Sequence, residues 1–344
     1  FGSMGRERGA SGYGKRFSAT QARKYKYQEN RQGMINRQAA FGSDLSLLRG
    51  ALHCHTTRSD GRREPAELLR AFAEKGYDFV ALTDHDRYNY TNYAPETGLL
   101  VITGMETEGN VKKAEGDRRV HTFHHVALGR AYEKGLTYEQ DEHIPFMTVD
   151  DQYGFIPRVE DLQRHGNLTF YCHPEWSGTA AREFEDIPGN FAMEVWNSGC
   201  AVDNGMDTNN ALYWDELLCR GKRIFAVAVD DCHHPRHEGL GWVMVRAEKN
   251  VDSVLNALQN GAFYASCGPE IHDFYVEDGT ARVVCSPCQS ITLRFERWPS
   301  HYAKGEGIRE TECRVPQGAG YVRAECVDAQ GRRAWSNPIF LNQI

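Results

Sequence analysis

The chain has 344 residues, a formal net charge of −7 and 40% hydrophobic residues. These values allow one large domain, or a large and a small one, with a substantial core. No run approaches the ~18 apolar residues that a membrane-spanning helix needs, so we expect no membrane partner. The ten cysteines have no framework spacing, and three lie inside histidine-rich motifs, which predicts reduced thiols in a cytoplasmic protein.

The charge is unevenly distributed. Residues 1–40 carry nine Lys or Arg and two acids, so the remainder is strongly acidic. An acidic body argues against binding nucleic acid beyond small nucleotides. We expect residues 1–48 to be a basic N-terminal extension that is mobile or draped over the surface, with the opening FGSM resembling a cloning scar.

Apolar runs of strand length alternate with helical patterns between residues 49 and 270. The first run, GALHCH, predicts a strand at 50–55, and PAELLRAFAEKG predicts a helix at 65–76, with Pro at its start and Gly after its end. Further strands are predicted at 78–86, 98–107, 122–129, 167–174, 191–199 and 222–231, and further helices at 157–166, 209–221 and 251–261. This order is typical of a parallel α/β barrel or a doubly wound sheet.

The pattern changes after about residue 270. Period-two alternation and turn residues such as Asp278-Gly279 replace the helical spacing. We therefore predict a small antiparallel β domain at residues 271–344, following an α/β domain at residues 49–270.

Histidines and carboxylates gather where the predicted strands end. In a strand, residues i and i+2 face the same way, so His53 and His55 point together, as do Asp231 and His233. Parallel barrel strands bring their carboxyl ends to one face, where barrel enzymes keep their active sites. The other strand ends contribute His85, Glu106, His173 and the pair His124 and His125.

So many buried carboxylates would repel one another without cations. Imidazole and carboxylate ligands suit Zn, Mn or Fe, and the set is too large for one ion. Taken singly, each histidine could be an ordinary core or surface residue, but all of them occupy predicted strand ends. His234 and His237 do not, and we assign them at most a place at the rim of the site.

The motifs HCHTTRSDG, ALTDHD, GMET, CHP and DDCH, in this order, resemble those of the PHP (polymerase and histidinol phosphatase) superfamily. The resemblance covers about residues 49–270. It implies a distorted seven-stranded (β/α)7 barrel that holds two or three divalent metal ions, Mn, Zn or Fe, and hydrolyses small phosphoesters with a metal-bridging hydroxide.

The resemblance also implies roles for individual residues. It assigns the first, catalytic metal to His53, His55, Glu106 and Asp231. It makes Glu106 the bridge to a second metal held by His173 and by a histidine of TFHHVALG. It assigns a third ion to Asp60, His85 and His233.

Two positions depart from the family pattern. The last motif reads Asp-Asp-Cys-His where relatives often have Ser-Asp-Ala-His, although the Asp-x-His pair is kept. In TFHHVALG, Val126 occupies the position where many relatives carry the ligand. Strand parity favours His124, which shares a face with Val126, over His125, and both stay candidates.

A barrel followed by a β domain, with FYASCGPEI at the junction, more loosely resembles the CehA/McbA-type branch of the superfamily. That resemblance implies hydrolysis of a carbamate or carboxylic ester as the alternative reaction. A non-catalytic, metal-binding regulatory module is a further alternative, but such a module is expected to have lost ligands.

Four arginines follow the motif strands and could hold the oxygens of a small phosphoester substrate: Arg58, Arg87, Arg182 and Arg236. Each could equally be a surface residue. Aromatic side chains near the strand ends could shape an apolar pocket or simply pack: Tyr88, Tyr90, Trp176 and Trp196. The oligomeric state is not indicated.

Overall fold

The computed structural model describes residues 37–41, 45–113, 115–116, 121–205, 209–296 and 300–341. The chain separates into two compact units, Phe1–Asn36 and Arg37–Ile344, and only the second is described here. Most of the predicted basic extension therefore lies outside the described residues. None of the described helices is long and apolar enough to cross a membrane.

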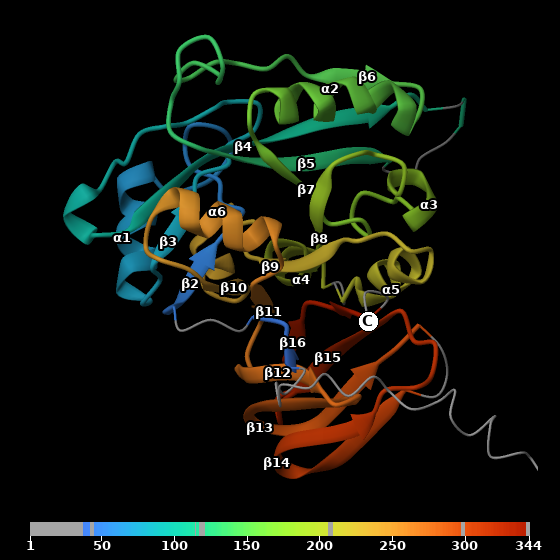
Figure 1. Cartoon of the computed structure of the whole chain (residues 1–344). Coiled ribbons are helices and arrows are strands. Elements are labelled where there is room, and N and C mark those ends of the chain that lie inside the picture. The colour runs from blue at the N-terminus through green and yellow to red at the C-terminus, as the bar shows by residue number, and fades with distance from the viewer. Residues whose placement is uncertain are drawn as a thin grey trace, which may run out of the picture. The chain divides into compact units, whose positions relative to one another are not determined.

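Two sets of parallel strands bring the motifs together (Figure 1). In the first set, β2 (Leu47–Ala51) pairs with β3 (Phe79–Ala81), which pairs with β4 (Leu100–Val111). In the second set, β7 (Leu168–Tyr171) pairs with β8 (Asn190–Asn197), which pairs with β9 (Phe225–Val229). The mixed α/β character predicted from the sequence is confirmed.

Strand β5 (Thr122–Gly129) departs from the parallel order expected of an α/β barrel. This strand runs antiparallel to both β4 and β7. The described residues between β4 and β5 contain no helix, and an antiparallel pair needs no helical crossover. Strand β10 (Trp242–Arg246) is likewise antiparallel to β2, while the short β6 (Met147–Val149) is parallel to β4.

The predicted helices are present with shifted ends. Helix α1 spans Pro65–Glu74, α5 spans Ala211–Cys219 and α6 spans Val251–Gln259. Helix α2, Gln152–Arg164, begins earlier than predicted. Asp151 caps its N-terminus by accepting hydrogen bonds from the Tyr153 and Gly154 amides. The short helices α3 (Ala181–Phe184) and α4 (Ser198–Asn204) and the 3-10 turns η2 (Pro95–Thr97) and η3 (Pro235–His237) were not predicted.

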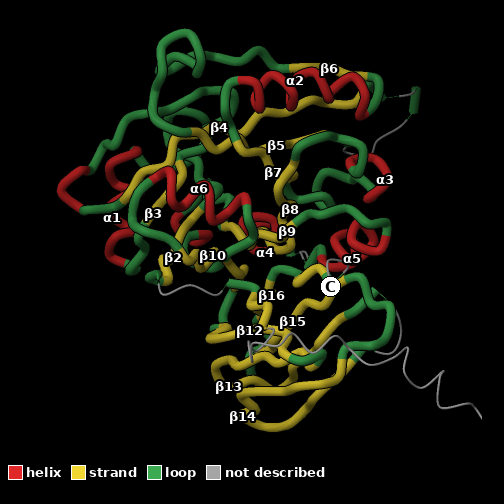
Figure 2. Tube along the Cα trace, in the orientation of Figure 1, coloured by secondary structure: helices red, strands yellow, loops and turns green. Residues whose placement is uncertain are grey.

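The described residues after α6 form strands and no helix (Figure 2). They are β11 (Phe263–Ser266), β12 (Ile271–Glu277), β13 (Thr280–Arg294), β14 (His301–Arg314), β15 (Tyr321–Val327), β16 (Arg333–Ser336) and β17 (Ile339–Phe340). All of their pairings are antiparallel, and β1 (Arg37–Ala39) joins the edge at β12. The boundary at residue 271 stays a prediction.

One buried ion pair ties this β segment to a helix of the α/β segment. The guanidinium of Arg323 on β15 is fully buried, and its Nε and Nη2 donate to the Asp215 carboxylate of α5 at 2.7 and 2.8 Å. Arg323 also faces Glu325 at 3.4 Å. Because the paired charges lie on different segments, the contact fixes β15 against α5.

Candidate metal centre

The segment that follows β2 places two imidazoles on one side of the backbone. Cys54 points into the core, so its neighbours His53 and His55 point the other way, and all three are fully buried. The Asp231 amide donates to the His53 carbonyl at 3.0 Å, and the His55 amide donates to the Cys232 carbonyl at 3.2 Å. These bonds hold the end of β2 beside the segment that follows β9.

Four buried ligand atoms converge in front of these segments. Two come from the segment after β2, one from the segment after β9 and one from β4. His53 Nε2 and His55 Nε2 lie 3.1 and 3.2 Å from Glu106 Oε2, and 3.4 and 3.2 Å from Asp231 Oδ1. An ion bound tetrahedrally at ~2.0–2.2 Å would space its ligands about 3.4 Å apart. The spacing of the four atoms therefore fits one small divalent cation.

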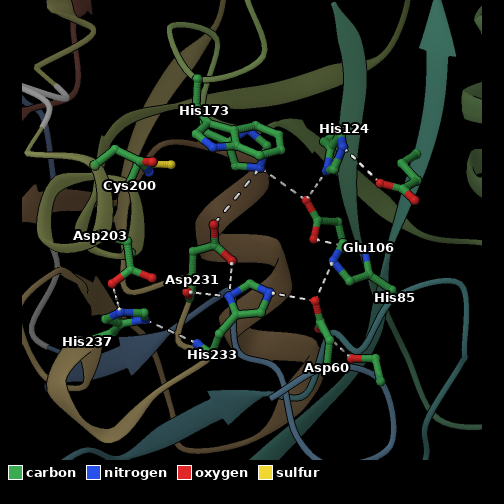
Figure 3. A pocket seen from close by; sticks show the side chains of 15 residues that line it. Asp60, His85, Glu106, His124, His173, Cys200, Asp203, Asp231, His233 and His237 are labelled. Carbon is green, nitrogen blue, oxygen red and sulfur yellow. Dashed lines mark hydrogen bonds and ion pairs between the residues drawn. The ribbon is translucent and has the colours of Figure 1, made fainter. Parts of the chain in front are cut away.

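Glu106 also faces a second group of histidines through its other oxygen. His124 Nδ1 lies 2.8 Å and His173 Nε2 lies 3.3 Å from Glu106 Oε1 (Figure 3). His85 Nδ1 lies 3.4 Å from Oε2. One carboxylate thus stands between two sets of imidazoles, as a bridging ligand would.

A third group lies closer to solvent. His233 Nε2 and His85 Nε2 lie 3.3 and 3.8 Å from Asp60 Oδ2, and His55 Nδ1 lies 3.6 Å from Asp60 Oδ1. The Asp60 side chain is 55% exposed, so this group is more accessible than the other two. Its atoms could hold a further cation.

Electrostatics of the cluster favour a cation. Burial lowers the pKa of His55 and of His124, but the facing carboxylates outweigh it and raise each pKa to about 9. Burial raises the pKa of Glu106, but the surrounding histidines outweigh it and hold that pKa well below its usual range. The carboxylates are therefore charged, and protons occupy the histidines that a metal would claim.

Two buried polar atoms without a hydrogen bond also indicate that the cluster binds cations. Asp231 Oδ1 and His85 Nδ1 are buried and have no partner of hydrogen-bond geometry among the described residues, although His55 Nε2 lies 3.2 Å from Asp231 Oδ1. Unsatisfied buried polar atoms are costly, whereas each of these two would be satisfied as a metal ligand. The donor set of imidazoles and carboxylates thus fits divalent ions such as Zn, Mn or Fe.

The backbone turns sharply at two of these residues. Asp231 has φ 47° and His173 has φ 24°, both outside the range usual for residues with a side chain. Such conformations persist only where the surroundings hold them, and they cluster at functional sites. Both turns aim a side chain into the cluster just after a strand has ended.

His125 is not brought to the cluster, so its assignment as a ligand is wrong. It is fully buried on the opposite face of β5, where its ring packs near Phe155 and Tyr171. Its Nε2 lies 3.1 Å from Asn190 Nδ2, and burial lowers its pKa to about 3. Strand alternation separates it from His124, in agreement with the parity argument.

A cavity of about 740 Å³ opens onto the three groups. It is lined by Ser59, Asp60, His85, Glu106, Glu108, His124, His173, Trp176, Gly199, Cys200, Asp203, Asn204, Asp231, His233 and His237. Among the described residues, no lysine or arginine lines it. Of the four aromatic candidates only Trp176 is present, because Tyr88 is buried against Asn167 and Trp196 donates to Ser198.

None of the four candidate arginines lines this cavity, so their assignment to substrate binding stays a prediction without support from the cavity. Arg58 pairs with Asp141 and donates to Tyr93 Oη at 2.7 Å. Arg236 donates to Asp203, Arg87 lies in a backbone bridge to His143, and Arg182 is exposed on α3. For Arg58 and Arg236, acidic or aromatic neighbours hold the guanidinium group.

Two functional candidates were missed in the sequence. Glu194 on β8 is fully buried, and its Oε1 lies 2.7 Å from His53 Nδ1. Its Oε2 accepts from the His173 amide at 2.8 Å and from Asn197 Nδ2 at 2.9 Å. Asn197 Nδ2 also donates to Asp231 Oδ2 at 3.0 Å. The signal was a glutamate inside the apolar run FAMEVWN, where a lone charge needs a buried partner.

Comparisons with known proteins agree with the motifs. Residues 51–169 match the family model of the PHP domain. The chain is 40% identical over 63 residues to a 5'-3' exoribonuclease of Haemophilus influenzae, covering 17% of this chain and 23% of that protein. It is 42% identical over 45 residues to the DNA polymerase/3'-5' exonuclease PolX of Bacillus subtilis, covering 13% of this chain and 8% of that protein.

The chain thus spans less than a quarter of the length of either curated relative. Among solved structures, it resembles a two-domain protein from Bacteroides vulgatus containing a predicted PHP-like metal-dependent phosphoesterase, with TM-score 0.44 and 15% identity, over 90% of this chain and 100% of that one. The match to the family model, which includes the HCHTTRSDG, ALTDHD and GMET motifs, assigns residues 51–169 to the PHP domain.

Proposed function

We propose that the chain is a metal-dependent hydrolase of small phosphoesters, built on the distorted seven-stranded barrel of its superfamily. The observation that carries the proposal is the position of Glu106, whose two oxygens face separate groups of imidazoles at the base of a cavity. Two or three divalent ions, when bound there, would supply a water of lowered pKa and would neutralise charge on the phosphoryl oxygens.

The protein's own side chains would position these ions, and they offer no nucleophile that competes with water. His53 and His55 are fully buried, and Asp231 is held by Asn197. Cys54 and Cys172 point into the core, and burial holds the pKa of each thiol well above its usual value. Burial also raises the pKa of Cys200, the thiol that lines the cavity. None of the three thiols is therefore a nucleophile, so hydrolysis would proceed by direct attack of water.

The lining of the cavity limits the substrate. Since no arginine or lysine of the described residues lines it, the ions alone would neutralise a phosphoryl group. Its acidic members, among them Asp60, Glu108 and Asp203, would repel a polyanion. We therefore favour a phosphoester of low molecular weight over a nucleic acid strand.

The same observation favours one second candidate. A cavity without basic side chains also suits a neutral carbamate or carboxylic ester, the reaction implied by the looser CehA/McbA-type resemblance. Trp176, whose ring stands edge-on to His124 and His173 at 5.5 and 4.9 Å between centroids, offers an apolar surface there. An activity assay decides whether the hydrolysed bond belongs to a phosphoester or to a carbamate or carboxylic ester.

The test is a substrate panel on protein reloaded with Mn²⁺ or Zn²⁺ after chelation. We expect hydrolysis of p-nitrophenyl phosphate and sugar phosphates, competitive inhibition by inorganic phosphate, and two or three ions per chain by elemental analysis. Turnover confined to aryl carbamates, without inhibition by phosphate, would show that the second candidate is right.

A pair of histidine variants controls for folding. His55→Ala removes a buried member of the cluster and is expected to abolish turnover. His272→Ala changes a half-exposed histidine of β12 and is expected to leave it unchanged. Full activity of His55→Ala, or of the chelated protein, would overturn the metal mechanism altogether.

A further inference from the structure

The loop after β9 fixes one carboxylate at the wall of the cavity. Asp203, at the end of α4, accepts three hydrogen bonds on a single oxygen. Oδ1 lies 2.6 and 3.1 Å from Arg236 Nη2 and Nε, and 2.7 Å from His237 Nε2; Figure 3 draws the contact with His237. Its other oxygen, Oδ2, makes no such bond among the described residues. One oxygen of a cavity-lining carboxylate is thus left available.

The hydrogen-bond pattern also fixes how Asp203 is held. His237 Nδ1 accepts from the His233 amide at 3.3 Å, so Nε2 carries the proton that is donated to Asp203. Arg236 is a donor only. Both partners lie on η3, three and four residues after His233, so Asp203 keeps a set position relative to the metal cluster. Although burial acts to raise the pKa of Asp203, the bonds from Arg236 and His237 outweigh it and keep the pKa below its usual value.

Beyond the metal cluster, the described residues that line the cavity include no lysine or arginine to bind an anion. Asp203, Asn204, Glu108 and Trp176 line it, and no described lysine or arginine does. A volume of about 740 Å³ is that of a pocket for a small molecule. The part of a substrate that does not react therefore meets an acceptor of fixed direction, not a basic group.

We propose that Asp203 determines specificity by accepting a hydrogen bond from the leaving group, so that the preferred substrates are phosphoesters of alcohols carrying a hydroxyl or ammonium donor. This inference rests on the proposed phosphoesterase function. The bond would be charge-assisted, because the acceptor is ionised. A hydrogen bond to a charged group is expected to favour the donor-bearing substrate by about tenfold or more.

The decisive variant is Asp203→Asn. Arg236 and His237 only donate to Oδ1, so the amide oxygen of the asparagine takes that place and its NH₂ group turns to the cavity. An acceptor becomes a donor while size is kept. The matched control is Asp186→Asn, which makes the same change at a carboxylate that faces Lys222 at 3.6 Å and does not line the cavity.

The assay compares ω-aminoalkyl and ω-hydroxyalkyl phosphates of two to five carbons with alkyl phosphates of equal length, on metal-loaded protein. We expect kcat/KM to favour one or both donor series by about tenfold at the chain length that reaches Asp203. The two series distinguish an ammonium from a hydroxyl donor. Asp203→Asn should remove this preference, and Asp186→Asn should keep it, with metal content equal in all three proteins.

Calorimetric binding of the corresponding phosphonates, which are not hydrolysed, separates the two claims. Phosphonate binding with a donor preference but no turnover of any phosphate would overturn the proposed reaction and keep the role of Asp203. Turnover of alkyl phosphates with no preference at any length, or a preference that survives in Asp203→Asn, would overturn the role of Asp203 alone.

Discussion

His53 Nδ1 lies 2.7 Å from Glu194 Oε1, with both side chains fully buried. If the imidazole donates through Nδ1, its Nε2 keeps a lone pair toward Glu106 and Asp231. A carboxylate behind a ligating histidine fixes its tautomer and raises its basicity. Glu194 therefore prepares His53 to bind a cation.

Replacing Glu194 with Gln should weaken metal binding about 10–100-fold. The His173 amide and Asn197 Nδ2 both donate to Oε2, so the amide oxygen would occupy that place and its NH₂ would face His53. His53 Nδ1 would then have to accept, and the proton would move to Nε2. Competition with a chromogenic chelator measures the affinity. Glu238→Gln, at a buried carboxylate paired with Arg63 and Lys75, is the control and should bind metal normally.

The neighbouring histidines of β5 should behave differently when each is changed to alanine. His124→Ala removes a group 2.8 Å from Glu106 and should lower the metal content while the fold is kept. His125→Ala should keep the metal content but lower the free energy of unfolding by about 2–5 kcal/mol, because it leaves a cavity in the core. Elemental analysis and thermal unfolding measure both. Loss of metal from His125→Ala at unchanged stability would contradict the orientation of β5.

Metal affinity should rise with pH between about 7 and 9. In the metal-free protein the pKa values of His55, His124 and His233 are raised to about 9, so protons compete with the metal below that pH. Calorimetric titration at pH 7 in buffers of different ionisation enthalpy should detect proton release. An affinity independent of pH over this range would mean that these histidines are not ligands.

The stability of the metal-free protein should show the opposite trend. The folded protein holds protons on these histidines that the unfolded chain loses above about pH 6.5, so the folded state binds more protons between pH 6.5 and 9. Its free energy of unfolding should therefore fall as pH rises through that window. Denaturant titrations with and without metal test this, since bound metal removes the titration.

Arg323→Leu should destabilise the protein by about 3–5 kcal/mol, because it removes the buried partner that donates twice to the Asp215 carboxylate and leaves Asp215 with the more distant Arg294 at 3.9 Å. Arg282→Leu makes the same change at an exposed, solvent-screened pair with Glu310 and should change the stability far less. Denaturant unfolding compares the two variants. Equal effects would mean that the contact between β15 and α5 contributes little.

The order of the metal motifs could be predicted from the sequence because each signal is local. An apolar run followed by His53 and His55, or by Asp231 and His233, reports both a strand and the face of its side chains. The opposite directions of His124 and His125 followed from the same alternation. Strand direction was not local: β5 runs antiparallel because of what joins it to β4, and the apolar run itself carries no sign of this.

The partners of long side chains could not be predicted from the sequence either. Arg58 and Arg236 follow motif strands, but their guanidinium groups are held by Asp141 and Asp203, which are distant in the chain. Glu194 was missed for the converse reason, since a single charge in an apolar strand has no periodic pattern. Both depend on partners that only the folded chain brings near.

The two oxygens of Glu106 have a consequence for the order in which ions are taken up. An ion bound between His53 and His55 would draw on the same carboxylate that an ion at His124 and His173 requires. The first ion would fix the rotamer of Glu106 and so relieve the second of that entropic cost, while its positive charge opposes a second cation close by. Occupancies of two such positions would therefore be thermodynamically linked, and a metal titration should depart from independent binding. Glu106→Gln should remove the linkage together with the affinity.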